Sequence, residues 1–247
     1  MIQFLLYVLV GFTAQTIDGA LGMAYGVSCT SFLLAVGVPA ALASASVHVS
    51  EVFTTFVSGI SHFKLGNVDR KLFKSLLIPG ILGGVIGAYV LTNFPGDALK
   101  PYISAYLLLM GIRIIYKSIK EFQKEPKEIG RGIYLLGFVG GMMDAVGGGG
   151  WGPIVTSTLV ARGNSARTTI GSVNASEFFV TLAEAIVFLI FLKMTTWQVI
   201  AGLIVGGVIA APLAAIVTKK LDPRKLMLGV GILISLLSLR TIYLAIF

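Results

Sequence analysis

Long apolar stretches separated by short polar segments run through the whole chain. Several stretches reach the roughly 20 consecutive apolar residues that a helix needs to cross a bilayer. They form two groups of four, at residues 2–36, 39–63, 75–96 and 101–116, and then at residues 132–161, 168–192, 195–217 and 226–247. The pattern predicts an all-α integral membrane protein, with the apolar N-terminal segment retained in the membrane rather than cleaved as a signal peptide.

The first stretch of each group has an unusual length and composition. It is too long for one untilted helix and too short for two full crossings. Each also carries an Asp and several glycines near its middle, at residues 18–26 and 144–152. Three geometries fit this pattern: one long tilted helix, two short spans, or a re-entrant hairpin whose tip stops within the membrane.

Glycine, hydroxyl and carboxylate positions recur 126 residues apart along the chain. The matched pairs include Gly11 with Gly137, Asp18 with Asp144, Gly26 with Gly152, Thr30 with Thr156, Ser46 with Ser172, and Glu51 with Glu177. An internal repeat in an apolar chain is typical of a transporter built from two homologous halves. We therefore expect repeats at residues 1–118 and 132–247, joined by a linker at 119–131 within one integrated membrane domain.

The distribution of charge predicts how the two halves are oriented. Charged residues make up only 12% of the chain, and Lys and Arg outnumber Asp and Glu by 19 to 11. If each first stretch enters and leaves on one side and three crossings follow, 16 of the 19 cations fall on one side. Cations concentrate on the cytoplasmic side of cell membranes. This predicts two inverted-topology repeats, each a broken or re-entrant helical hairpin followed by three transmembrane helices, with a cytoplasmic linker and extracytoplasmic termini.

The two glycine-rich breaks are candidates for an anion site. Glycine lets backbone N–H groups approach a ligand, and the N-terminus of a broken helix attracts negative charge without any basic side chain. Pro153 suits the first turn of a resumed helix. The alternative is that these glycines only permit close helix packing. The candidate binding residues are Gly22, Gly26, Gly148, Gly149, Gly150, Gly152, Thr30, Ser31, Thr156 and Ser157.

Carboxylates inside the apolar stretches form a second set of candidates. Asp18, Glu51, Asp144, Glu177 and Glu184 have no nearby Lys or Arg in the sequence. A carboxylate in hydrocarbon is costly, so such residues usually line a polar cavity. Burial disfavours their charged form, which makes them candidates to carry a proton. The first four are therefore assigned to proton coupling or gating, with capping of a broken helix as the alternative.

Four further side chains accompany these motifs. His48 lies one helical turn before Glu51, and its repeat partner is Asn174, so both are candidate ligand contacts. The aromatic residues Tyr25 and Trp151 match across the repeat beside the breaks and are candidates to line the binding cavity, with packing or an interfacial role as the alternative. We expect no metal site, because only two histidines and no ligand cluster occur in the sequence. No cofactor motif is present, and the lone Cys29 is expected to be a buried small side chain.

The duplicated layout resembles the sulfite exporter TauE/SafE family of membrane transporters. The resemblance rests on a glycine-rich first segment followed by Ser-x-x-x-Ser-Glu at residues 46–51 and 172–177, and it covers nearly the whole chain. It implies a secondary transporter, in the export direction, of a small sulfur-containing anion such as sulfite, thiosulfate or an organosulfonate. The expected partners are that anion and the bilayer, with no nucleic acid and with a homo-oligomer left open. The alternatives are a passive anion channel and a membrane scaffold subunit for a sulfur-metabolism partner.

Overall fold

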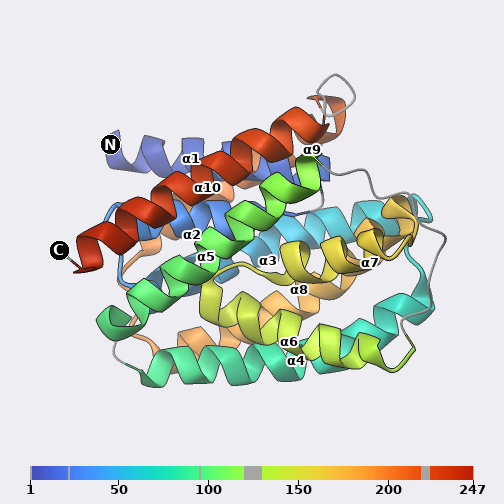
Figure 1. Ribbon diagram of the computed structural model, residues 1–247, viewed down its shortest axis with the longest axis horizontal. Helices are drawn as coiled ribbons and strands as arrows, with labels where there is room; N and C mark the ends of the chain where they lie inside the picture. The colour runs from blue at the N-terminus through green and yellow to red at the C-terminus, as the bar shows by residue number, and fades with distance from the viewer. Residues whose placement is uncertain (1, 22, 95, 120–129, 218–222, 247) are drawn as a thin grey trace.

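The computed structural model describes residues 2–21, 23–94, 96–119, 130–217 and 223–246, and its regular structure is helical (Figure 1). The helices of the first half are α1 (Ile2–Leu21), α2 (Tyr25–Ala35), α3 (Ala40–Lys64), α4 (Arg70–Asn93) and α5 (Gly96–Ile119). Those of the second half are α6 (Gly132–Gly147), the π-helical turn η1 (Gly152–Thr156), α7 (Ser157–Ala161), α8 (Ala166–Phe191), α9 (Trp197–Val217) and α10 (Pro223–Ile246).

Five helices in the described ranges are long and apolar enough to cross a membrane. They lie within α3, α4, α5, α8 and α10. The apolar parts of α1, α2, α6 and α9 are shorter. The prediction of an all-α, multi-pass membrane protein is therefore confirmed.

Each half begins with a helix that breaks and then resumes. In the first half α1 ends at Leu21 and α2 begins at Tyr25. In the second half α6 ends at Gly147, and the chain becomes helical again in η1 and α7. Three long helices follow each break, in the order that the apolar pattern predicted.

The two halves interlock rather than forming separate bundles. Helix α1 packs against α9 of the second half, and its counterpart α6 packs against α4 of the first half. The equivalent helices α3 and α8 pack against each other, and so do α5 and α10. Figure 1 shows α5 and α10 crossing one face of the bundle, with α4 beside α6. If each helix is replaced by its equivalent in the other half, the same set of helix pairs therefore results.

Several cationic side chains connect neighbouring turns at the two ends of the bundle. Arg167, near the start of α8, donates from Nε to Oδ1 of Asn67 at 2.6 Å, which joins the α7–α8 and α3–α4 connections. At the opposite end, Arg240 donates to the carbonyl oxygen of Ala35. Both chain termini lie at this second end (Figure 1). The α3–α4 connection, which is flanked by Lys64, Arg70 and Lys71, and the two termini therefore lie at opposite ends.

Candidate functional site

The two helix breaks meet in backbone contact at the centre of the molecule. A Cβ atom built on Gly26 would lie 2.6 Å from Cα of Gly149, which is closer than side chains can tolerate. Gly148 and Gly149 have φ angles of 64° and 145°, in the region that favours glycine. Both the crowding and the backbone conformation thus require glycine where the breaks cross.

A small space lies at this contact. Its volume is about 10 Å³, close to the minimum that holds one water molecule. Backbone from both breaks lines it together with four carboxylates from four helices. The lining residues are Asp18, Ala24, Tyr25, Gly26, Val27, Glu51, Asp144, Gly149, Gly150, Gly152, Pro153 and Glu177. This space is called the central cavity below.

The structure brings nine of the eighteen candidate site residues to the central cavity. Both carboxylate pairs, Asp18 with Asp144 and Glu51 with Glu177, line it, as do Tyr25 and four of the six candidate glycines. Gly22 lies outside the described residues. Gly148 is displaced from the cavity wall, and its carbonyl oxygen accepts a hydrogen bond from the Thr30 hydroxyl. Thr30 therefore links the second break to α2 through this hydrogen bond.

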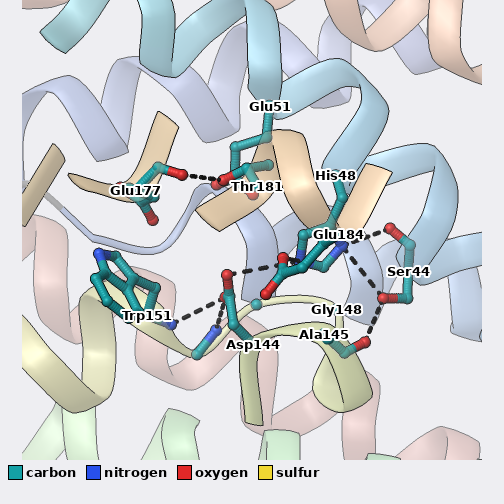
Figure 2. Close-up of polar contacts among 12 residues, drawn as sticks. Ser44, His48, Glu51, Asp144, Ala145, Gly148, Trp151, Glu177, Thr181 and Glu184 are labelled. Atoms are coloured by element: carbon teal, nitrogen blue, oxygen red, sulfur yellow. Dashed lines mark hydrogen bonds and ion pairs between the residues drawn. The ribbon is translucent and has the colours of Figure 1, made fainter. Parts of the chain in front are cut away.

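Asp144 caps the resumed helix of the second half. Its Oδ1 accepts hydrogen bonds from the backbone N–H groups of Gly150 at 2.6 Å and Trp151 at 2.9 Å (Figure 2). Asp18 makes the matched contact in the first half, accepting from the N–H of Tyr25 at 3.4 Å. Both contacts have the geometry of the capping alternative, and the N–H groups of Gly150 and Trp151 already have an acceptor.

His48 joins the second break to helix α8. Its Nε2 lies 2.8 Å from Oε2 of Glu184 and 3.6 Å from Oδ2 of Asp144, and all three side chains are buried. Its Nδ1 lies 2.7 Å from the carbonyl oxygen of Ser44, which can only accept, so Nδ1 carries a proton. The Ser44 hydroxyl in turn donates to the carbonyl oxygen of Ala145 at 2.6 Å. Figure 2 shows this connection between α3, α6 and α8.

The 2.8 Å contact between Nε2 of His48 and Oε2 of Glu184 needs a proton between the two atoms, because each can act as a hydrogen-bond acceptor. Because Nδ1 already holds a proton, a neutral His48 presents a bare Nε2 toward a carboxylate oxygen. A second proton, held by either group, makes the 2.8 Å contact favourable. Glu184 and Asp144 each retain an oxygen with no hydrogen-bond partner among the described residues. The group is therefore suited to cations rather than to anions.

The expectation of no metal site stays a prediction, but the fold brings together three side chains of metal-ligating types that are far apart in the sequence. One ligand atom from each of His48, Asp144 and Glu184 lies within 4.8 Å of the others. One imidazole nitrogen and two carboxylate oxygens form a donor set that suits divalent transition metals, and the Nδ1–carbonyl bond is the usual outer contact of a ligating histidine. Sequence reasoning missed the cluster because these residues lie on three different helices. Glu184 itself, two turns after Glu177 on the same helix, was recognised only as a buried acid.

Glu51 and Glu177 occupy equivalent positions on the two central helices. They are 4% and 8% exposed, and both line the central cavity. Their backbone carbonyls accept the matched hydroxyls of Thr55, at 2.6 Å, and Thr181, at 2.7 Å. The side-chain Oε2 of Glu51 has no partner within the described ranges. Both acids are therefore buried, and no salt bridge among the described residues neutralises either of them.

The two matched aromatic residues pack against glycines of the opposite half. A Cβ on Gly80 of α4 would meet the Trp151 ring, and one on Gly207 of α9 would lie 3.5 Å from the Tyr25 hydroxyl. Trp151 is fully buried, and its Nε1 donates to the carbonyl oxygen of Val173 at 3.2 Å. The Trp151 side chain thus fixes the second break by packing and does not line the cavity, whereas Tyr25 does.

The remaining candidates lie outside the cavity wall. Ser157, the first residue of α7, donates to the carbonyl oxygen of Pro153 in η1, and Asn174 donates from Nδ2 to the Ser58 hydroxyl at 3.0 Å. Ser31 and Thr156 are buried, and within the described part of the chain their hydroxyl oxygens have no partner. Cys29 is also fully buried and unbridged, as expected. A ligand would reach these groups only after the cavity widened.

Comparisons with known proteins point to one class of membrane protein. The family model described as Sulfite exporter TauE/SafE matches residues 7–241. A curated protein of Bacillus subtilis (strain 168), the "Probable membrane transporter protein YtnM", is 43% identical over 248 residues, covering 97% of this chain and 83% of that protein. No solved structure matches the chain.

Proposed function

This chain belongs to the sulfite exporter TauE/SafE family, and from that premise we propose that it is a secondary transporter that exports a small sulfur-containing anion. The family and the named relative indicate a membrane transporter rather than an enzyme. The substrates we propose are sulfite, thiosulfate or an organosulfonate. We propose that the protein lies in the cell membrane, with both termini on the extracytoplasmic side.

The observation that carries this proposal is the central cavity at the crossing of the two breaks. Irregular backbone within a membrane is tolerated where it lines a cavity, and in secondary transporters such broken helices form the substrate site at the repeat interface. Here both breaks and four carboxylates, three of them buried, contribute to one space. Its volume of about 10 Å³ is too small for a polyatomic anion, so the cavity has to widen to load substrate.

The carboxylates make proton coupling part of the proposal. An anion and four ionised acids in one low-dielectric space would repel strongly. No Lys or Arg is among the residues that line the cavity, so protons have to neutralise these acids when the anion binds. Glu51 and Glu177 are the proposed carriers, because Asp18 and Asp144 are engaged in capping.

We further propose that the two repeats are inverted and that each first segment is a re-entrant hairpin. The 11 residues of α2 span only about 16 Å, roughly half of the hydrocarbon thickness. The exchange of helix partners between the halves supports a pseudo-two-fold relation. One half rocking against the other would then open the central cavity to each side in turn.

Counterflow in liposomes tests the proposal. Purified protein is reconstituted with unlabelled sulfite inside, and uptake of labelled sulfite is measured, with thiosulfate, sulfate and a sulfonate as competitors. A carrier concentrates the label transiently and saturates, whereas a channel only equilibrates it. Absence of exchange with every anion, in vesicles shown to hold folded protein, would reject the anion-carrier assignment. A proton-sensitive dye in the same vesicles then tests coupling separately.

A further inference from the structure

An apolar groove opens on the outside of the bundle between α3, α4 and α8. Its volume is about 590 Å³, far larger than the central cavity. The helices that form it are the two that carry Glu51 and Glu177, together with α4. The groove starts at the α3–α4 connection, at the end of the bundle opposite the chain termini.

Phenylalanine rings form a continuous wall along this groove. The ring centroids of Phe56 and Phe178 are 5.3 Å apart, those of Phe178 and Phe179 are 5.0 Å apart, and those of Phe179 and Phe73 are 6.0 Å apart. Phe56 and Phe179 are 49% and 42% exposed, so the wall is accessible. A row of rings contributed by three helices presents an elongated apolar surface, which suits an extended hydrocarbon chain.

Three cations stand at the same groove: Lys64 at the end of α3, and Arg70 and Lys74 in the first turns of α4. All three are exposed, and no hydrogen bond or ion pair within the described ranges engages their side chains. This differs from Arg167 and Arg113, whose guanidinium groups are bonded to Asn67 and Thr158. The positive charge at the groove is therefore available to an external ligand.

We propose that this groove binds one anionic phospholipid, with its phosphate among Lys64, Arg70 and Lys74 and an acyl chain along the phenylalanine wall. The charge identifies the headgroup, because basic pockets between membrane helices select anionic lipids. The apolar wall identifies the tail, because a free phosphate would leave it uncovered. A zwitterionic lipid would bring its own cation into a site that already holds three.

A lipid in this groove would contact both helices of the transport site. Thr55, which lines the groove, donates its hydroxyl to the backbone carbonyl of Glu51, and Ala175 lies two residues before Glu177. A lipid bound in the groove would therefore favour one relative position of α3 and α8, and this would change the rate of transport. This regulatory consequence rests on the proposed function, whereas lipid binding itself does not.

Native mass spectrometry of the delipidated protein tests binding directly. Phosphatidylglycerol and phosphatidylcholine of equal chain length are titrated separately, with glycerol phosphate as a headgroup-only competitor. We expect at least tenfold tighter binding of phosphatidylglycerol and little competition by the headgroup. Equal affinity for the two lipids, or full displacement by glycerol phosphate, would overturn the proposal.

Charge-matched variants locate the site. The triple variant K64Q/R70Q/K74Q should lose the tenfold preference, whereas K100Q/K193Q/K225Q, which removes the same charge elsewhere, should keep it. The single variant Lys74→Glu, at an exposed position, should weaken phosphatidylglycerol binding severalfold even if the triple variant does not fold. Unchanged binding in either groove variant would place the lipid elsewhere. Retained binding without any effect of phosphatidylglycerol on counterflow would reject only the regulatory consequence.

Discussion

His48 of α3 and Glu184 of α8 face each other at 2.8 Å, and their counterparts one repeat away make the equivalent contact with neutral groups. Asn174, the partner of His48, donates to Ser58, the partner of Glu184, at 3.0 Å. The same pair of helices is thus joined twice, once by an ionisable pair and once by an amide and a hydroxyl. The two halves therefore share the same backbone arrangement, but only the contact between His48 and Glu184 is made by ionisable side chains.

The first prediction concerns Glu184→Gln. Glutamine keeps the size of the side chain but cannot hold a negative charge against His48, so the buried pair loses its charge-assisted bond. We expect counterflow to fall at least tenfold while the protein stays folded. The matched control is Ser58→Ala, at the equivalent neutral contact, where we expect less than a twofold change. Equal effects at the two positions would mean that helix packing, rather than charge, is what matters.

The second prediction concerns the pH dependence of Glu51→Gln and Glu177→Gln. In the unaltered protein, anion exchange should increase as pH falls, because protonation removes negative charge from the central cavity. Glutamine is neutral at every pH, so each variant should show a flatter profile, and the double variant the flattest. Counterflow, which needs no net proton movement, should persist. A variant whose pH profile matches that of the original protein would remove that residue from coupling.

The third prediction concerns Gly26→Ala, where the two breaks touch. The added methyl group would lie 2.6 Å from Cα of Gly149, so one break has to move. Overpacking of this kind costs about 1–3 kcal/mol. Gly229→Ala in α10 is the control, because its Cβ meets nothing within 4 Å. Thermal unfolding midpoints in detergent should fall for the first variant and stay level or rise for the second; equal midpoints would contradict the backbone contact.

The fourth prediction separates the two roles open to Asp144. Asp144→Ala leaves the buried N–H groups of Gly150 and Trp151 without an acceptor, at a cost of about 1–3 kcal/mol for each unsatisfied group. Asp144→Asn keeps an acceptor oxygen and should retain most of the stability. Both variants lose the charge next to His48 and should transport poorly. Thermal unfolding combined with counterflow distinguishes them, and equal destabilisation by Ala and Asn would argue against capping.

Part of the site could be read from the sequence because its signals are local or repeated. Apolar length predicted the helices, and clustered glycines beside Asp18 and Asp144 located both breaks. The 126-residue repeat also singled out Glu51 and Glu177 as an equivalent pair, and the fold places both at the central cavity. Repetition shows that two positions occupy equivalent environments, which is why it was informative without any knowledge of how the halves pack.

Other features arise only when distant helices pack together. Ser44, His48, Asp144 and Glu184 come from three helices of both halves, and no spacing along the chain connects them. Trp151 resembled a cavity residue from its position in the sequence, yet its ring fills the space left by Gly80 of α4. The groove at Lys64 likewise exists because α8 lies beside α3 and α4. Local pattern thus specified helices, breaks and pairs of equivalent residues, whereas interhelical packing selected which of those residues meet.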